Sequence, residues 1–262
     1  MSVLSGEVHL RIEELSKEYM IKSKQGYAYQ RLPTLENISL EVSRGEFVSI
    51  IGPSGCGKST LFNIISGLEK PDAGKVFLQG RDITGLRGKV AYMLQKDLLL
   101  PWRSILDNCI LALELQNVTR SKARQQAMDM LRELNLGDFS ANYPAQLSGG
   151  MRQRVSFVRT MLAGKEVLLL DEPFGALDAY TKSEMHDWLT DSFQKYRPTV
   201  LFITHDIEEA ILLSDRIYVL TPRPAAIRLQ IGVDLPHPRT RDLLVRESFV
   251  DIKRVLLKEL FN

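Results

Sequence analysis

Cysteine is scarce in this sequence, with Cys56 and Cys109 the only two among its 262 residues. Two cysteines so far apart form neither a disulfide framework nor the spacing of a metal site. Because Cys56 lies inside a glycine-rich stretch, a reduced, cytosolic setting is the simpler interpretation. We therefore expect neither a disulfide-bonded scaffold nor a cysteine-ligated metal module.

An excess of charge is also missing: 34 lysines and arginines face 32 aspartates and glutamates, for a formal net charge of +2. This balance gives no argument for nucleic acid, which usually needs a concentrated basic face. Long apolar runs are lacking too, since "EVLLLDEP" and "TVLFITH" fall far short of the roughly 18 residues that span a bilayer. The first residues become charged too early for a signal peptide. We expect a chain that does not itself cross a membrane.

The pattern of the chain predicts an α/β fold in a single domain over residues 1–262. Strand patterns such as "VHLRIEEL", "LENISLEV" and "GEFVSIIG" come first, and strands alternate with helices again after residue 165, which indicates a mostly parallel sheet. Residues of about 97–164 read as a helical subdomain. A C-terminal helix is predicted at about 240–261, and we expect its apolar stripe to pack on its own domain rather than on another subunit.

A glycine-rich stretch, "IGPSGCGKST", follows an apolar strand pattern and opens a helical one. It fits G-x-x-x-x-G-K-[ST] in the context that this phosphate-binding motif requires. Glycines let successive N–H groups point inward, and the helix N-terminus adds the positive end of its dipole. Lys58 is expected to reach the β- and γ-phosphates and Ser59 to bind Mg²⁺. The predicted binding residues, called the phosphate loop below, are Gly52, Pro53, Ser54, Gly55, Cys56, Gly57, Lys58, Ser59 and Thr60.

A carboxylate pair, Asp171 and Glu172, ends the apolar run "VLLLDE". Such a strand end places Asp171 near a bound metal, and Glu172 can then orient or deprotonate a water that attacks the γ-phosphate. His205 ends a further apolar run, and parallel strands bring their carboxyl ends to one crevice. Together with the phosphate loop, these residues predict the hydrolysis of ATP, with GTP as the alternative.

A second anion site is predicted at "LSGGM", where Ser148, Gly149 and Gly150 precede a helical pattern. The N-terminus of a helix is a ready-made anion site, and one nucleotide does not need two such sites on one chain. If two chains face each other head to tail, each nucleotide lies between the phosphate loop of one and the helix tip of the other. An ordinary capped helix is the alternative for this motif taken alone.

Together these motifs resemble the ATP-binding subunits of ABC transporters. The phosphate loop, Gln95 in "YMLQKD", the "LSGG" motif, the carboxylate pair, Asp178 in "GALD" and His205 stand in the order of that family, over about residues 8–235. The resemblance implies a P-loop NTPase-type ABC ATPase with a RecA-like, mostly parallel sheet core, an antiparallel β subdomain and a helical insert.

The resemblance also implies a role for each residue around the reacting phosphate. Gln95 would contact Mg²⁺ and the attacking water, and Asp171 would join Ser59 as a metal ligand. Glu172 would be the catalytic base, and His205 would hydrogen-bond the γ-phosphate. ATP and Mg²⁺ are thus the implied cofactors.

Further implied contacts concern the dimer and the adenine. Ser148 and Gly150, with Gly149 between them, would hold the γ-phosphate of the partner chain's ATP, and Asp178 would bridge the dimer. An aromatic residue before the phosphate loop normally stacks on adenine. Tyr19 fits best, but Tyr27 and Tyr29 remain alternatives because they lie in an unusually long stretch before "LENISL".

The implied partners are a second ATPase subunit, transmembrane permease subunits and an extracytoplasmic solute-binding protein. The chain would be peripheral, on the cytoplasmic face of the membrane. The run "LLLPWRSILDN", residues 98–108, directly follows the segment of Gln95. It is either exposed apolar surface for a permease helix or ordinary core of the helical subdomain.

The segments "LLLPWRSILDN", "LSGGMRQRVSFVRT", "DEPFGALDAYTK" and "VDLPHPRTRD" are similar to importer ATPases of the nitrate, sulfonate and taurine group, which includes bicarbonate and thiamine-precursor importers. In such systems the binding protein and the permease select the cargo, so the sequence does not name it. The alternative is a non-transport ABC ATPase acting on DNA or ribosomes, but the helical insert is too short for a coiled coil and the chain has one phosphate loop. A metabolic kinase would lack "LSGG".

Overall fold

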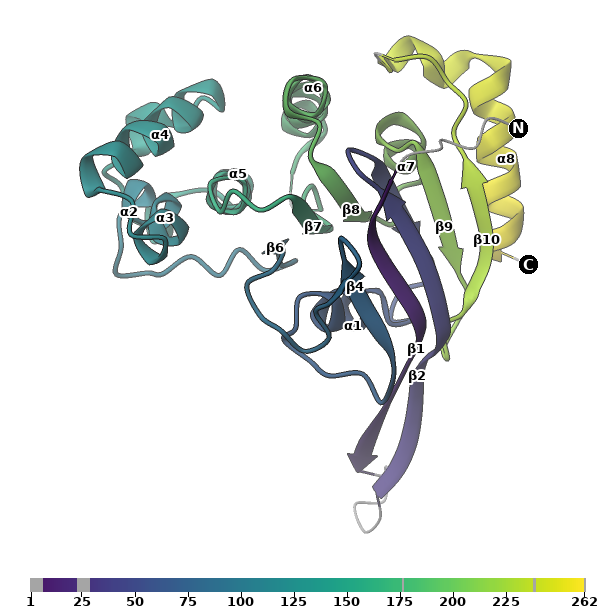
Figure 1. Cartoon of the computed structure of the whole chain (residues 1–262). Helices are drawn as coiled ribbons and strands as arrows, with labels where there is room; N and C mark the ends of the chain where they lie inside the picture. The colour runs from purple at the N-terminus through teal and green to yellow at the C-terminus, as the bar shows by residue number, and fades with distance from the viewer. Residues whose placement is uncertain (1–6, 23–28, 176, 238, 262) are drawn as a thin grey trace. The chain divides into compact units, whose positions relative to one another are not determined.

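The computed structural model describes residues 7–22, 29–175, 177–237 and 239–261 (Figure 1). The chain divides into two compact units: unit 1 holds residues 1–90 and 190–262, and unit 2 holds residues 91–189. The phosphate loop and His205 belong to unit 1. Gln95, the carboxylate pair and the "LSGG" motif belong to unit 2. No helix in the described ranges is both long enough and apolar enough to span a membrane.

Unit 1 contains an antiparallel sheet with the strand order β2-β1-β4-β5. Its strands are β1 (Val8–Lys22), β2 (Tyr29–Ser43), β4 (Ala73–Leu78) and β5 (Arg81–Asp82). The strands β1 and β2 run well past the predicted 8–15 and 35–42, and pair as far as Lys22 opposite Tyr29. Beyond Leu15, β1 has no fully buried residue, so this part lacks the apolar alternation on which the prediction depended.

The second sheet of unit 1 positions the phosphate loop. Strand β3 (Phe47–Ile51) lies between β8 (Thr199–Ile203) and β9 (Arg216–Leu220) and is parallel to both, while β10 (Ile227–Gly232) is antiparallel to β9. Every residue of β3 and β8 is buried, as expected for parallel strands covered on both faces. Helix α1 (Lys58–Ile65) follows β3, and α7 (Ile207–Leu213) follows β8.

The C-terminal helix α8 (Glu247–Phe261) follows a short 3-10 helix, η3 (Arg241–Val245). Phe249 and Leu256 are fully buried in one cluster with residues of α7 and β9, and Ile252 and Leu260 pack against the same cluster. This is the stripe that the sequence predicted. The expectation that it packs on its own domain is confirmed.

Unit 2 contains β6 (Ala91–Met93) parallel to β7 (Val167–Asp171). The stripe of Ala123, Ala127 and Leu131 is buried, as the 3.6-residue period requires. The helices of unit 2 are α2 (Ile105–Cys109), α3 (Leu111–Leu115), α4 (Arg120–Glu133), η1 (Gly137–Phe139), η2 (Pro144–Gln146), α5 (Gly149–Met161) and the start of α6 (Ala179–Tyr196), which ends in unit 1.

Candidate active site

The phosphate loop of unit 1 begins where β3 ends and leads into α1. Gly57 precedes the helix with φ 129°, and no side chain among the described residues caps this end. A Cβ at Gly57 would lie 2.8 Å from Leu35 Cδ2, so both the conformation and the space require glycine. A helix that begins without a side-chain cap offers its first N–H groups to an anion.

Lys58 lies folded over its own loop. Its Nζ donates to the carbonyl oxygens of Gly52 at 2.8 Å and Pro53 at 3.0 Å, and the residue is buried. The N–H of Cys56 closes the same turn on Pro53 O at 3.3 Å. These neutral acceptors can be exchanged for phosphate oxygens, which form stronger, charge-assisted hydrogen bonds with an ammonium group.

His205 follows β8, the parallel neighbour of the strand that leads into the phosphate loop. Ile50 pairs with Ile203, so the chain leaves both strands at the same edge of the sheet. The imidazole is exposed, and the next residue, Asp206, caps α7 by accepting from the N–H groups of Glu208 and Glu209. The structure thus brings His205 to the edge where the phosphate loop begins.

Of the three candidate tyrosines, Tyr19 lies against the start of α1. Its hydroxyl donates to Glu69 Oε2 at 2.7 Å and lies 3.4 Å from Thr60 Oγ1. Burial and the bond to Glu69 raise the pKa of Tyr19. Tyr29 is 65% exposed at the start of β2, and Tyr27 lies outside the described residues.

The carboxylate pair of unit 2 stands at the end of β7. Asp171 is buried, and Tyr92 donates to its Oδ2 at 3.3 Å. Burial and the negative charge of Asp171 raise the pKa of Tyr92, so the phenol stays a donor. Glu172 has φ 47°, a left-handed backbone conformation that is uncommon for a non-glycine residue. Gln95 Nε2 donates to Glu172 Oε2 at 3.0 Å.

The "LSGG" motif, residues 147–150, forms the N-terminus of α5. Ser148 is the N-cap, and its Oγ accepts from the N–H of Met151 at 3.2 Å. Ser148 and Gly149 are exposed. This helix end therefore satisfies one of its own N–H groups and presents the others to solvent.

Asp178 caps the start of α6. Its carboxylate accepts from the N–H groups of Tyr180 and Thr181 and from the Thr181 hydroxyl at 2.7 Å. The hydroxyl of Thr181, followed by these backbone donors, lowers the pKa of Asp178. The group is thus a stable anion at an exposed position.

The apolar run at residues 98–108 is divided between surface and core. Leu98 is 52% exposed and Trp102 is 72% exposed, whereas Leu99, Ile105 and Leu106 are buried. The run therefore combines exposed apolar side chains with ordinary core of unit 2.

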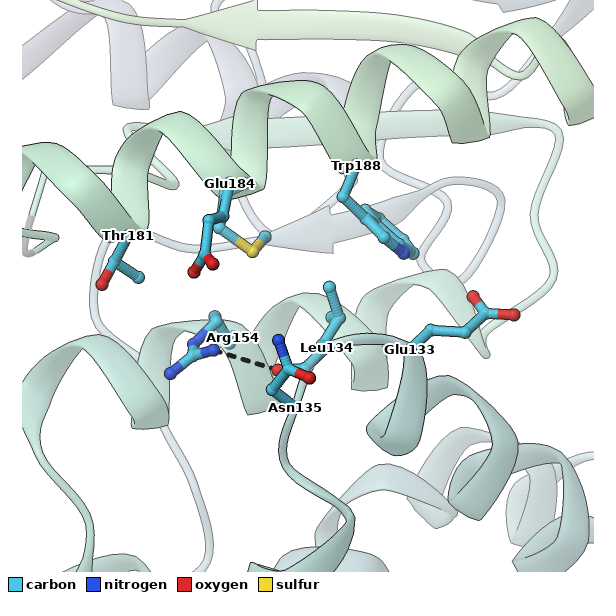
Figure 2. A pocket seen from close by; sticks show the side chains of 8 residues that line it. Glu133, Leu134, Asn135, Arg154, Thr181, Glu184 and Trp188 are labelled. Atoms are coloured by element: carbon cyan, nitrogen blue, oxygen red, sulfur yellow. Dashed lines mark hydrogen bonds between the residues drawn. The ribbon is translucent and has the colours of Figure 1, made fainter.

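A small pocket of unit 2 lies between α4, α5 and α6 (Figure 2). Arg154 of α5 borders it and donates to Leu134 O at 2.9 Å. Trp188 also lines it and packs edge-on against Phe157, with ring centroids 5.2 Å apart. Its volume of about 70 Å³ is too small for a nucleotide, because pockets that enclose ligands measure about 300–1,000 Å³.

Comparison with known proteins identifies the family of this chain. A protein-family model described as ABC transporter matches residues 35–175, more than half of the chain. The chain belongs to the ABC transporter family.

Relatives that match over nearly the whole chain include two import ATP-binding proteins. An aliphatic sulfonates import ATP-binding protein, SsuB of Bacillus cereus, is 39% identical over 95% of this chain and 94% of that protein. A formylaminopyrimidine import ATP-binding protein, ThiZ of Halalkalibacterium halodurans, is 44% identical over 93% of this chain and 98% of that protein. The resemblance to ABC importer ATPases of this group is confirmed.

Solved structures of the ABC transporter cassette MJ0796 are similar to this fold. Its dimeric structure has a TM-score of 0.77 and 30% identity and covers 87% of this chain and all of that one. A second, at 29% identity, is described as a post-hydrolysis state bound to ADP and Pi. The predicted ABC ATPase fold is confirmed, and this chain is an ATP-binding ABC-type ATPase.

Sequence reasoning missed three residues around the motifs of this ABC ATPase. Tyr92 bonds to Asp171, and Arg152 bonds to Asp97, with Nε 3.0 Å from Oδ2. The alternation of β6 marks Tyr92 only as a strand residue, and nothing in the order of residues pairs Arg152 with a carboxylate 55 positions away.

Proposed function

We propose that this chain is the ATP-hydrolysing subunit of an ABC importer for a small solute. The observation that supports an importer most is the 39–44% identity, over more than nine tenths of the chain, to ATP-binding proteins named for sulfonate and formylaminopyrimidine import. The proposed cargo class is a small organic or inorganic anion of the nitrate, sulfonate or taurine type, or a related small solute such as a thiamine precursor.

The phosphate loop is proposed to bind the ATP triphosphate. Its N–H groups and the start of α1 face the phosphates, while Lys58 turns from Gly52 O and Pro53 O to the β- and γ-phosphates. Tyr19 would stack on the adenine, which is supported by its contact with Thr60. The residues 52–60 thus act together as the binding element of unit 1.

Mg²⁺ fits the donor groups of this chain. The Ser59 hydroxyl, the Asp171 carboxylate and the Gln95 amide offer the oxygen atoms that this ion prefers, and Mg²⁺ is usually held by one or two carboxylates plus substrate phosphates. When bound, the ion would neutralise the charge that develops on the β- and γ-phosphate oxygens.

Glu172 is proposed to accept the proton of the attacking water. Its carboxylate is oriented by the Gln95 amide at 3.0 Å and by the uncommon backbone conformation at φ 47°. Gln95 would also hold the water. His205 would donate a hydrogen bond to the γ-phosphate and so stabilise the charge on this phosphoryl group in the transition state.

A head-to-tail dimer is proposed as the active form. Ser148, Gly149 and Gly150 of one chain would bind the γ-phosphate held by the phosphate loop of the other, and Asp178 would bridge the two chains. Loss of the γ-phosphate removes charge-assisted contacts and opens the dimer.

Permease subunits and a solute-binding protein are the remaining proposed partners, with this chain peripheral on the cytoplasmic face of the membrane. The exposed side chains of Leu98 and Trp102 follow Gln95 closely in sequence. A permease helix that covers them would bury apolar surface next to a residue of the hydrolytic site.

Co-purification from native membranes with a tag on this chain tests the importer. Recovery of a multi-span permease and a solute-binding protein is expected, and the ligand of the binding protein would name the cargo. Trp102→Ala should lose the permease, while Phe261→Ala should retain it, because Phe261 is an 81% exposed aromatic residue of unit 1. Recovery of DNA or ribosomes without a membrane protein would contradict the importer and leave the ATPase.

A further inference from the structure

The helix that carries the "LSGG" motif is connected to its surroundings by arginines. Arg154 donates to Leu134 O (Figure 2), and Arg159 donates to the carbonyl oxygens of Asp97 and Leu98 at 2.6 and 2.8 Å. In each case a guanidinium of α5 holds a backbone carbonyl from another segment of unit 2. The helix is therefore bonded to two other segments of unit 2.

Arg152 makes two contacts at once, one to a backbone carbonyl and one to a carboxylate. Its Nη1 donates to Leu147 O at 2.7 Å, and its Nε lies 3.0 Å from Asp97 Oδ2. Leu147 directly precedes Ser148, the N-cap of the helix. One rigid guanidinium thus joins the first residue of the "LSGG" motif to the segment that follows Gln95.

Asp97 is itself held by three hydrogen bonds. Its Oδ1 accepts from the N–H of Leu99 at 3.2 Å, its Oδ2 faces Arg152, and its backbone carbonyl accepts from Arg159. The side chain of Arg152 is 35% exposed and that of Asp97 is 30% exposed. The pair is therefore partly screened by water, and its value lies in orientation more than in stability.

A guanidinium suits this task better than an ammonium. Its donors stand in a fixed plane, so a contact at Nε determines where Nη1 points. With Asp97 fixed, Arg152 has one direction in which to hold Leu147 O. Lysine at this position could reach one of the two acceptors as a point charge, without fixing the other.

We propose that Arg152, held by Asp97, is a positioning residue for the "LSGG" motif, orienting Ser148–Gly150 toward the γ-phosphate bound by the partner chain. The proposal rests on the proposed head-to-tail dimer for its consequence in catalysis. It also links the segment after Gln95 to the motif, so that a movement of residues 97–98 would shift the phosphate-binding end of α5.

Hydrogen exchange of the nucleotide-free subunit tests the positioning directly. The N–H groups of Met151 and residue 152 donate to Ser148, and Arg152→Ala should make both exchange about tenfold faster through local opening. Residues 58–65 should keep their rates. Arg103→Ala is the matched control, because Arg103 forms a similar pair with Glu114, at 30% and 32% exposure and 2.6 Å.

Steady-state hydrolysis tests the consequence. Arg152→Ala should lower kcat about 10- to 100-fold, as expected for misplacement of a phosphate-binding group by an ångström. The affinity of the dilute monomer for ATP should not change, because that binding belongs to the phosphate loop. Arg152→Lys should recover part of kcat.

A double-mutant cycle separates positioning from independent structural roles. If Asp97 acts through Arg152, the double variant Asp97→Ala with Arg152→Ala should be no slower than Arg152→Ala alone. Additive losses of kcat, or unchanged exchange at 151–152 in Arg152→Ala, would overturn the proposal. A wild-type protein that does not hydrolyse ATP would instead overturn the proposed function, and the exchange rates would still decide this inference.

Discussion

Two helices of this protein begin at motifs predicted to bind phosphate, and they begin in different ways. Helix α1 starts at Gly57, at φ 129° and with no side-chain cap among the described residues. Helix α5 starts at Ser148, whose hydroxyl accepts from the N–H of Met151. The start of α1 depends on a glycine and a lysine. The start of α5 depends on the Ser148 cap and on the hydrogen bond from Arg152 to Leu147 O.

The difference indicates a division of tasks. An uncapped helix end with a lysine folded over its loop has donors that an incoming polyanion can take over. A capped end is stable without a ligand and contributes its exposed N–H groups as a second contact. Binding affinity should therefore depend mainly on the motifs of unit 1, and turnover mainly on those of unit 2.

The largest expected effect separates turnover from binding. Glu172→Gln removes the proposed base while keeping an oxygen that can accept from Gln95, so kcat should fall by roughly 10²–10⁴. The affinity for ATP should be retained, because the phosphate loop is unchanged. Phosphate release and nucleotide binding measured on the same preparation check both parts, and an equal loss in affinity would break the comparison.

A matched pair of glycine substitutions compares the two helix starts. Gly57→Ala would place a Cβ 2.8 Å from Leu35 Cδ2 at a positive φ. It should lower the free energy of unfolding by about 1–3 kcal/mol and should also weaken ATP binding. Gly149→Ala would bring its Cβ no closer than 3.9 Å to Arg152 Nη2, so stability should change by less than about 0.5 kcal/mol.

Denaturant unfolding and ATP binding distinguish the two variants. A Gly149→Ala protein as unstable as Gly57→Ala would show that the start of α5 is as constrained as the phosphate loop. This result would contradict the difference between the two helix starts.

The sequence predicts a feature of this molecule best when the residues that form it lie close together along the chain. The phosphate loop is a local motif, so its strand, turn and helix follow from consecutive residues. The bond from Gln95 to Glu172 joins residues 77 positions apart, and the bond from Arg152 to Asp97 likewise depends on tertiary packing. Neither has a periodic signal in the sequence.

Exposure in apolar runs shows the same limit. The run "LLLPW" contains Leu98 at 52% exposure next to buried Leu99. The two side chains have the same hydrophobicity, and Leu98 has φ 44°, which turns the chain between them. The exposure of each leucine thus depends on the path of the backbone, which composition does not record.

The smallest expected effect concerns Asp178 at the start of α6. Thr181→Val removes the hydroxyl that, with the backbone donors, lowers the pKa of Asp178, so this pKa should rise toward its usual value of about 3.9. A lowered pKa stabilises the fold above the unfolded-state pKa, and this contribution is lost as the pH falls through the folded-state value. The part of the stability difference that comes from the Asp178 pKa should therefore disappear at low pH.

An NMR titration of the Asp178 carboxylate measures the shift. Thr119→Val is the control, because Thr119 precedes α4 and provides no side-chain cap to it. Thr160→Val would not serve, because Thr160 is buried. An unchanged Asp178 pKa in Thr181→Val would contradict the assigned cause.

Mixing two inactive variants tests the central claim, that each nucleotide lies between the phosphate loop of one chain and the "LSGG" motif of the other. Lys58→Ala removes the phosphate-loop charge. Ser148→Asp keeps an equally good helix cap and places a negative charge where the γ-phosphate should bind. A mixed dimer then has one site with both elements intact, so phosphate release should return when the two proteins are combined. A mixture that is as inactive as its components would contradict the account.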